Sequence, residues 1–400
     1  MAPLSREEAV ALDEEDPLRA FRDRFVDEDP SRIYLDGNSL GRLPLATRDR
    51  LAATVAQWGA ELVSGWHDWI DAPARVGDLL AEHVLGASPG EVIAGDSTTV
   101  NLYKLSAAVL EAREGAIVTD RGNFPTDRYV LEGLAARSGR ELRLVDTPEQ
   151  AAREDAALVV LSHVGYHSGE IADMAALTAP HVVWDLSHSA GAIPVDLNAN
   201  GVELAVGCTY KYLNGGPGAP AYLYVAQERQ AQLRSPIWGW FGQRDQFAME
   251  RDYDPVDGIG RFQAGTPPIL ALAAVEEGVK LTAEAGIAAI RAKSISLTEL
   301  IVALHDAWLA PLGFGLGSPR DPVRRGSHVS VTHPQAWQIN VALIERANVV
   351  PDFRGPDAIR LGVAPLYTSH ADVWDALDRL RALVERDEHG LVDAAPGRVT

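Results

Sequence analysis

A series of short apolar segments between residues 95 and 226 constrains the fold of this chain more than any other feature. The segments are AIVTD, ELRLVD, ALVVLS, HVVWD, VELAVGC and APAYLYV, and helical or loop stretches separate them. Because continuous apolar runs suit strands that are buried on both faces, the pattern predicts a mostly parallel sheet. Strands that alternate with helices predict a doubly wound α/β domain, which binds ligands beyond the carboxyl ends of its strands.

The regions on either side predict a second, smaller domain of mixed α and β structure. SREEAVALDEED is typical of a helix with Ser5 as its cap, IYLDGNSLG predicts a short strand and a turn, and a long helix is expected from Pro44. TPPILALAAVEEGVKLTAEAG predicts another long helix. We therefore expect a large α/β domain over residues 46–285 and a small α+β domain formed by residues 1–45 and 286–400.

Composition and charge exclude several classes of function. A formal net charge of −20 argues against nucleic acid or an anionic membrane as a partner. A lone cysteine, Cys208, cannot form an internal disulfide framework or a cysteine-based zinc site, and the histidines lack metal-ligand spacing, so no metal is expected. The acidic N-terminus is unlike a signal peptide, and no apolar run approaches the roughly 20 residues of a membrane span. These features predict a cytoplasmic protein.

Two neighbouring apolar segments end in residues that can react with a cofactor. HVVWDLSHSAG runs into Asp185 and then His188, and VELAVGCTYKYLNGGPG runs into Tyr210 and Lys211. A lysine at the end of a buried strand offers an amine that can condense with an aldehyde. A carboxylate on the preceding strand can hold a pyridinium nitrogen protonated, which makes pyridoxal 5'-phosphate (PLP) an electron sink.

A third segment, GDSTTVNLYK, offers hydroxyls for a phosphate group. Thr98 and Thr99 precede a helical stretch, where exposed backbone N–H groups suit an anion. Taken singly, each of these features has an ordinary structural explanation: a helix cap, a strand-end turn or a solvated lysine. Taken together and in this order, they predict a PLP site.

The same segments carry a resemblance to a known family. GNSLG, FPTD, YKYLNGGPG and GWFG, together with QAGTPPIL and IRLGVAPLYTS, resemble the kynureninases, which are fold-type I PLP enzymes of the class V aminotransferase group. The resemblance runs from residue 34 to about residue 369. It implies a mostly parallel seven-stranded sheet flanked by helices, PLP as cofactor, and a homodimer whose active sites are shared across the interface.

The resemblance also implies roles at the cofactor. Lys211 would bind the cofactor covalently and move the α-proton of the substrate, Tyr210 would serve as an acid, and Asp185 would pair with the pyridinium nitrogen. Further residues would surround the ring and the phosphate group: Thr98, Thr99, Phe124, Pro125, Thr126, Asp127, Ser162 and His188.

Other positions would serve the substrate and the partner subunit. Trp240 and Thr266 would reach across the dimer interface to the neighbouring cofactor. Arg360 would bind the substrate carboxylate, and Asn38 and Ser39 would lie in the substrate pocket. From the residues alone, a surface arginine and a plain Asn-Ser-Gly turn remain the alternatives at these places.

The activity that the resemblance implies is hydrolytic cleavage of L-kynurenine to anthranilate and L-alanine, in tryptophan degradation. The sequence departs from the family pattern at Thr98-Thr99, at His167-Ser168-Gly169 and at Gln243. Thr266 and the WGAE stretch look like the bacterial type that prefers L-kynurenine, with 3-hydroxykynurenine as the other substrate. A class V aminotransferase, a cysteine desulfurase-like lyase and a non-catalytic PLP-binding protein are the alternatives.

Overall fold

The computed structural model describes residues 5–177, 181–249 and 252–392, which form two compact units. The large unit comprises residues 46–165 and 172–284, and the small unit comprises residues 1–45, 166–171 and 285–400. This division differs from the boundaries predicted from the sequence at the short segment 166–171. That segment belongs to the small unit because its backbone bonds there: Gly326 donates to the carbonyl of Gly169 at 2.7 Å, and Ile171 donates to the carbonyl of Arg324 at 2.9 Å.

The large unit is built on a seven-stranded sheet, as predicted. Its strand order is β2-β8-β7-β6-β5-β3-β4, and the five strands from β7 to β4 are parallel to their neighbours in this sequence, whereas β8 runs antiparallel to both β7 and β2. The strands are β2 (Val92–Ala94), β3 (Ile117–Asp120), β4 (Leu142–Val145), β5 (Leu158–Ser162), β6 (Val182–Asp185), β7 (Leu204–Gly207) and β8 (Tyr222–Val225). The six apolar segments of the sequence are β3 to β8. The sequence did not predict β2, because its three residues are too few to show a periodic pattern.

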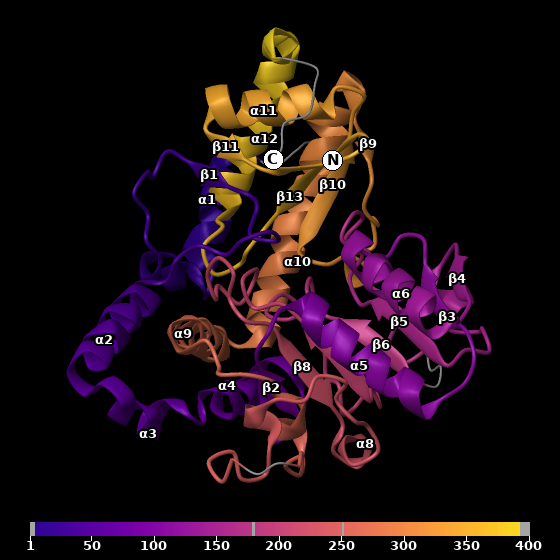
Figure 1. Cartoon of the computed structure of the whole chain (residues 1–400). Helices are drawn as coiled ribbons and strands as arrows, with labels where there is room; N and C mark the ends of the chain where they lie inside the picture. Colours follow the sequence, from indigo (N-terminus) through magenta and orange to yellow (C-terminus); the bar gives the residue numbers. More distant parts are fainter. Residues whose placement is uncertain (1–4, 178–180, 250–251, 393–400) are drawn as a thin grey trace. The chain divides into compact units, whose positions relative to one another are not determined.

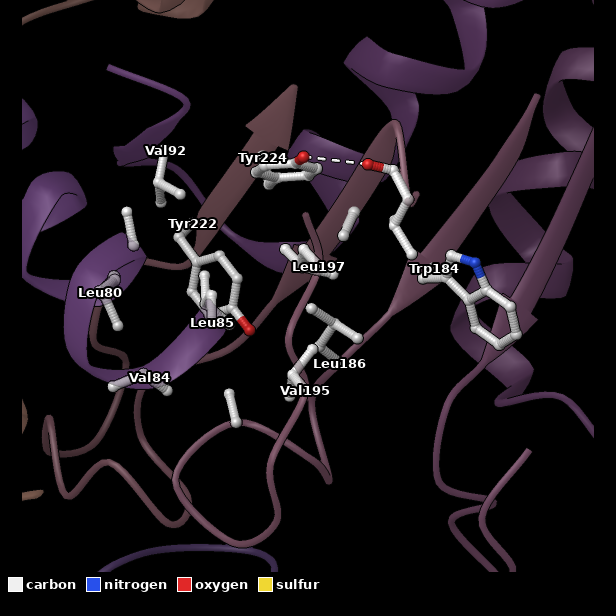
Figure 2. Close-up of a cluster of buried hydrophobic side chains, with 14 of the residues drawn as sticks. Leu80, Val84, Leu85, Val92, Trp184, Leu186, Val195, Leu197, Tyr222 and Tyr224 are labelled. Atoms are coloured by element: carbon white, nitrogen blue, oxygen red, sulfur yellow. Dashed lines mark hydrogen bonds between the residues drawn. The ribbon is translucent and has the colours of Figure 1, made fainter. Parts of the chain in front are cut away.

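Successive residues of these strands enter two separate cores. Val159, Trp184 and Tyr222 face one cluster, and Val160, Val183 and Leu223 face the other. Figure 2 shows the first cluster, with Trp184, Tyr222 and Tyr224 among the aliphatic side chains of the surrounding helix and loops. Burying one large apolar side chain contributes roughly 1.5–3 kcal/mol, so two filled faces fix the sheet and therefore the positions of its strand ends.

Helices cover both faces of this sheet, and α5 and α6 carry predicted site residues. α5 packs on the second core through Leu102 and Leu105, and α4 packs on the first through Val76 and Leu80 (Figure 1). The helices are α2 (Leu45–Glu61), α3 (Trp66–Trp69), α4 (Ala72–Leu80), α5 (Thr98–Ala112), α6 (Pro125–Ser138), α7 (Pro148–Ala151), α8 (Gln227–Gln230) and α9 (Ile269–Ala285). α2 and α9 confirm the two long helices expected from the sequence.

The small unit combines an antiparallel sheet with four helices. Its sheet has the order β12-β13-β10-β9, and a separate parallel pair joins β1 to β11. The strands are β1 (Ile33–Tyr34), β9 (Gly315–Leu316), β10 (His328–Thr332), β11 (Val349–Val350), β12 (Asp352–Arg354) and β13 (Ala358–Gly362). The helices are α1 (Arg6–Glu15), α10 (Ile287–Leu304), α11 (Ala336–Ala347) and α12 (His370–Glu385). Ser5 caps α1 as expected, in a reciprocal capping box with Glu8.

One short connection brings the N-terminal segment against the small sheet. Leu35 donates to the carbonyl of Val350 at 2.8 Å, and Gly362 donates to the carbonyl of Leu35 at 2.7 Å. Asp36 pairs with Gly362 in a parallel bridge. The residues that follow β1 are therefore held beside the end of β13. Among the described residues, no helix is both long enough and apolar enough to cross a membrane.

Candidate active site

The carboxyl ends of β5, β6 and β7 place the predicted cofactor residues at one edge of the large sheet. Ser162 ends β5 and lies in register with Asp185, which ends β6. Lys211 follows the end of β7 at Gly207 in a tight turn, in which Asn214 donates to the Lys211 carbonyl at 3.0 Å and Gly215 donates to the Thr209 carbonyl at 2.9 Å. Parallel strands present their ends together, so residues from three segments of the chain meet here.

The Lys211 side chain is buried among the residues predicted to surround a cofactor. It is 9% exposed, and its Nζ lies 3.2 Å from Nε2 of His188. The same Nζ lies 5.9 Å from the centre of the Phe124 ring and 5.8 Å from that of Tyr210. A lysine this buried is uncommon unless its amine has a partner or a task. We call Lys211, His188, Asp185, Asp127 and Phe124 the cofactor cluster.

Asp185 and Asp127 form a buried pair of carboxyl groups behind the lysine. Asp185 is 6% exposed and accepts from the backbone N–H of Ser187 at 2.8 Å. Asp127 lies in the first turn of α6, and its Oδ2 has no hydrogen-bond partner within the part of the chain that the structure describes. Burial, followed by the negative charge of Asp185, raises the pKa of Asp127 well above its usual range. Asp127 therefore keeps its proton at neutral pH.

Asn123 organises the segment that carries Phe124, and no role was predicted for it from the sequence. Its Oδ1 accepts from the Ser162 hydroxyl at 2.7 Å and from the Phe124 N–H at 2.7 Å, while its amide donates to Thr119 Oγ1 at 3.0 Å. It thereby fixes Ser162 and the N-terminus of α6, which begins with Pro125 and Thr126. An Asn before FPTD looks like a turn residue, so only its burial at 2% exposure identifies it as a buried link.

The N-terminus of α5 offers the predicted anion site. Ser97, rather than either threonine, is the cap, and its hydroxyl accepts from the N–H of Val100 at 3.3 Å. Thr98 and Thr99 open the helix, and the buried Oγ1 of Thr98 has no partner among the described residues. Free N–H groups and a free hydroxyl at the start of a 15-residue helix fit a phosphate group.

Tyr210 and Cys208 flank the lysine with different environments. Tyr210 is half-buried, and its pKa is raised first by burial and then by the neighbouring Cys208, so its phenol keeps its proton. Cys208 is 3% exposed, with its Sγ 3.7 Å from the carbonyl of Ser187, and burial raises the pKa of its thiol. The thiol is therefore neutral and poorly nucleophilic.

A second polar cluster surrounds Arg360 on β13, in the small unit. The guanidinium is 1% exposed, and its Nη1 donates to the Tyr166 carbonyl at 2.7 Å. Its Nε donates to Asp352 at 2.8 Å, and its Nη2 donates both to Asp352 and to the Ser39 hydroxyl at 3.1 Å. The structure thus brings two predicted substrate residues, Arg360 and Ser39, into direct contact.

Asn38, the third predicted substrate residue, packs against the same strand. It is fully buried, and neither its amide nitrogen nor its amide oxygen has a partner among the described residues. A Cβ at Gly362 would lie 1.7 Å from the Asn38 Oδ1, so only glycine allows this approach. An uncompensated buried amide is costly, which favours a polar ligand at this place.

Trp240 and Thr266 lie outside the cofactor cluster. Trp240 is 39% exposed in a 3-10 turn, Trp240–Gly242, and stacks edge-on against Phe241 with ring centres 4.6 Å apart. Thr266 is also exposed, in a loop whose Ala264 carbonyl accepts from the Phe241 N–H at 3.3 Å. The two residues therefore sit on adjoining loops at the surface of the large unit.

The departures from the family pattern fall in both units. His167 is half-buried, and its pKa is lowered by burial and then by the positive charges of Arg360 and Arg354. Gln243 accepts from the N–H of Asp254 at 2.8 Å and so holds its own loop. Within the described ranges, no group of three or more His, Cys, Asp or Glu side chains is arranged to hold a metal ion.

Residues of the large unit fit PLP at three points. Lys211 offers the amine, Asp185 a carboxyl group for the ring nitrogen, and the unpartnered Thr98 hydroxyl at the start of α5 a donor for the phosphate. The orphaned Oδ2 of Asp127 and the ring of Phe124 complete the surroundings. The site therefore has the side chains that a PLP-dependent enzyme of this fold requires.

Solved structures with the same fold support this class. The chain is similar to a variant of the lyase C-DES solved with glycine covalently linked to its PLP cofactor, with a TM-score of 0.77, 18% identity, and coverage of 88% of this chain and 97% of that one. It is also similar to a cysteine desulfurase from Thermococcus onnurineus NA1, with a TM-score of 0.75, 19% identity, and coverage of 96% and 100%. The fold class is thus that of the fold-type I PLP enzymes.

Sequence comparison identifies the family within this class. The chain is 44% identical to the kynureninase of Pseudomonas fluorescens and 43% identical to that of Burkholderia pseudomallei, covering 96% of both chains in each comparison. The family model "Kynureninase C-terminal domain" matches residues 290–380. The chain belongs to the kynureninase family, which is a family of hydrolases, and the family predicted from the sequence is confirmed.

Proposed function

We propose that this protein uses PLP to cleave L-kynurenine with water, giving anthranilate and L-alanine. The observation that carries the proposal is the buried Lys211 amine, 3.2 Å from His188 at the strand ends of a kynureninase-family chain. We take L-kynurenine as the substrate, and 3-hydroxykynurenine as the alternative to be assayed beside it.

Each side chain of the cofactor cluster has one task in this proposal. When bound, PLP supplies an electron sink that stabilises negative charge on substrate carbons. Lys211 carries the cofactor and, once released by the substrate amine, takes the α-proton on its Nζ. The Asp185 carboxyl group would pair with the ring nitrogen, with the protonated Asp127 beside it. Thr98, Thr99 and Ser162 bind the phosphate region.

Proton delivery would fall to Tyr210, and recognition of the substrate carboxylate would fall to Arg360. Tyr210 keeps its phenolic proton, because burial raises its pKa, and can donate it to the leaving alanyl carbon. Arg360 binds the substrate carboxylate through charge-assisted hydrogen bonds, with Asn38 and Ser39 beside it.

We infer that the protein acts as a homodimer in the cytoplasm. The large unit has an apolar groove of about 430 Å³, lined by Thr54, Trp58, Trp66, Trp69, Ile269 and Leu270. Trp58 is 56% exposed and Leu270 is 40% exposed, which places these residues in a surface groove and not in the core. A contiguous apolar surface of this kind is typical of a subunit interface. Trp240 and Thr266, which are also exposed, would then reach the neighbouring cofactor.

The other enzyme classes receive less support. A cysteine desulfurase-like lyase needs an exposed, ionised thiol, whereas Cys208 is buried and its pKa is raised. A class V aminotransferase would release a keto acid, and a non-catalytic binding protein would release no product. Measuring alanine against pyruvate separates these outcomes.

The direct test uses the purified protein, its Lys211→Ala variant and a matched Lys280→Ala control, whose lysine is a surface residue of the same unit. We expect a yellow protein that forms fluorescent anthranilate and alanine in equal amounts, a colourless and inactive Lys211→Ala variant, and an unchanged control. Colour without anthranilate would reject the kynurenine reaction but keep the cofactor. No colour after PLP is added would reject both, and a PLP-loaded monomer would reject the shared site.

A further inference from the structure

One carboxylate oxygen of Asp352, on β12, contacts both Arg360 and Arg354. We call Arg360, Arg354, Asp352, Asp36 and Ser39 the Arg360 cluster. The Oδ2 of Asp352 accepts from Nε and Nη2 of Arg360, from Nη2 of Arg354 at 3.0 Å and from the Ser39 hydroxyl at 3.1 Å. The residue is fully buried, and its Oδ1 has no partner among the described residues. The side edge of the Arg360 guanidinium is thereby fixed by a carboxylate of the protein itself.

The remaining donors of Arg360 determine where an outside anion can bind. A guanidinium has five N–H groups, and the contacts to Asp352, Tyr166 and Ser39 use four of them. The Ser39 hydroxyl accepts one of these and also donates to Asp352, so it can turn aside when a carboxylate arrives. Asp352 therefore holds the arginine by one edge while the other edge exchanges Ser39 for a ligand.

A second carboxyl group, that of Asp36, faces the same charges. It follows β1, and its Oδ1 is buried without a partner in the described part of the chain. The charged groups around it are Asp352, Arg354 and Arg360; Tyr34 and Tyr367 are the other ionisable groups that face it, and the Tyr34 hydroxyl donates to the Asp36 carbonyl at 3.2 Å. Burial, followed by the charge of Asp352, raises the pKa of Asp36 to about 7.

Charge balance links these groups to the substrate. Arg354 and Arg360 carry two positive charges, and Asp352 and a bound carboxylate carry two negative charges. An ionised Asp36 would add a third negative charge to a buried place, which is unfavourable. The cluster is balanced with a ligand bound only when Asp36 is protonated.

We propose that Asp352 is a positioning residue for Arg360, and that Asp36 takes up a proton when the substrate carboxylate binds. Asp36, Asp352, Arg354 and Arg360 thereby act as one carboxylate site. The proposal rests on the proposed function for the identity of the substrate. Beyond that function, we propose that recognition of the carboxylate depends on Asp352 and Asp36 and on pH.

The sign of the pH effect follows from the direction of the Asp36 pKa shift. Below about pH 7 the group already carries its proton, so carboxylate binding is unimpeded. Above that pH the proton must be taken from solvent, and the affinity falls by up to about tenfold per pH unit until the pKa of the complex is reached. The pKa of His167, which lies near Arg354 and Arg360, is lowered first by burial, so His167 is neutral above about pH 7, where the affinity is expected to fall.

The test compares two ligands in the PLP-loaded dimer between about pH 6 and about pH 9. The KM of L-kynurenine is measured beside the inhibition constant of its decarboxylated amine, which shares the amine and the ring but lacks the carboxylate. Titration of the cofactor or of the ligand amine affects the binding of both compounds. The KM of L-kynurenine divided by the inhibition constant of the amine therefore reports recognition of the carboxylate alone. We expect this ratio to rise above about pH 7 in the unsubstituted protein.

Three variants separate the roles of the acidic residues. Asp352→Asn should raise the KM of L-kynurenine roughly tenfold or more, and should leave the inhibition constant of the amine and the PLP absorbance unchanged. Asp352→Glu, which keeps the carboxylate, should raise the KM less. Asp36→Asn mimics the protonated group and should give a ratio that no longer rises with pH. Asp23→Asn, which removes the same charge from an exposed position of the small unit, is the matched control.

The outcomes separate this proposal from the proposed function. If the protein does not cleave L-kynurenine, the proposed function fails first. If it does, and the ratio is independent of pH or Asp36→Asn keeps the original rise, the proposal is overturned. If Asp352→Asn does not fold, Asp36→Asn still decides, because within the described residues Asp36 forms no hydrogen bond or ion pair with either arginine.

Discussion

Lys211 and Arg360 are both buried basic side chains in polar surroundings, but the two clusters are assembled differently. Lys211, Asp185 and Ser162 stand at adjacent ends of parallel strands, where the sheet order alone brings them together. Arg360 lies inside an antiparallel strand, and its partners come from three separate segments: Ser39 after β1, Tyr166, and Asp352 on the paired strand β12. A topological rule places the first cluster, whereas specific hydrogen bonds place the second.

The comparison predicts separate consequences for variants in the two clusters. Substitutions in the cofactor cluster should abolish the PLP absorbance or lower kcat. Changes around Arg360 should leave the absorbance intact and weaken substrate binding. A variant that affected both properties equally would show that the clusters are not independent in function.

The largest effect is expected for Asp185→Asn. Removing one partner of a buried charge pair costs about 3–5 kcal/mol, which corresponds to at least about a hundredfold loss of kcat/KM. Asp146→Asn, just after the end of the edge strand β4 in the same sheet, is the control, because its side chain is 76% exposed. Steady-state assays at saturating PLP measure the loss, and near-normal kcat would refute the role of Asp185.

A smaller effect is expected for Arg360→Lys. The charge stays, but the planar group that reaches Asp352, Ser39 and the substrate is lost. Hydrogen bonds to charged groups contribute about 1.5–3 kcal/mol, so KM should rise roughly ten- to a hundredfold with little change in PLP absorbance. Arg386→Lys, whose arginine is 72% exposed, is the control. An unchanged KM would show that the carboxylate binds elsewhere.

The smallest effect is expected for Asn123→Ala. The substitution leaves the Ser162 hydroxyl and the Phe124 N–H without their shared acceptor, at a cost of about 1–3 kcal/mol in the free energy of unfolding. We expect weaker PLP binding in an absorbance titration, and a kcat that recovers when PLP is saturating. A kcat that stays low at saturating PLP would instead place Asn123 in the chemistry.

The cofactor cluster can be predicted from the sequence because each of its reactive residues follows a recognisable apolar segment. Each reactive residue follows its own apolar strand, so strand patterning and the parallel rule predict their proximity. The Arg360 cluster has no such signal. Neither Asp352 nor Asp36 is near Arg360 in a recognisable motif, and their roles depend on the register of β12 with β13 and on the bridge from Asp36 to Gly362.

Two further features could not be read from the sequence for physical reasons. The segment 166–171 joins the small unit through backbone hydrogen bonds, which leave no trace in residue type. The role of Asn123 depends on its burial, since the same residue before a proline-containing turn is usually a solvated cap. Family resemblance supplied the substrate residues Arg360, Asn38 and Ser39, which patterning alone would have left as surface or turn residues.

The central claim is that Lys211 carries the cofactor. Borohydride reduction of the PLP-loaded protein fixes the cofactor to the amine that holds it, and peptide mapping by mass spectrometry then locates the label. The chain has only three other lysines, Lys104, Lys280 and Lys293. We predict that the label lies on the peptide containing Lys211, and a label on any of the other three would contradict the account.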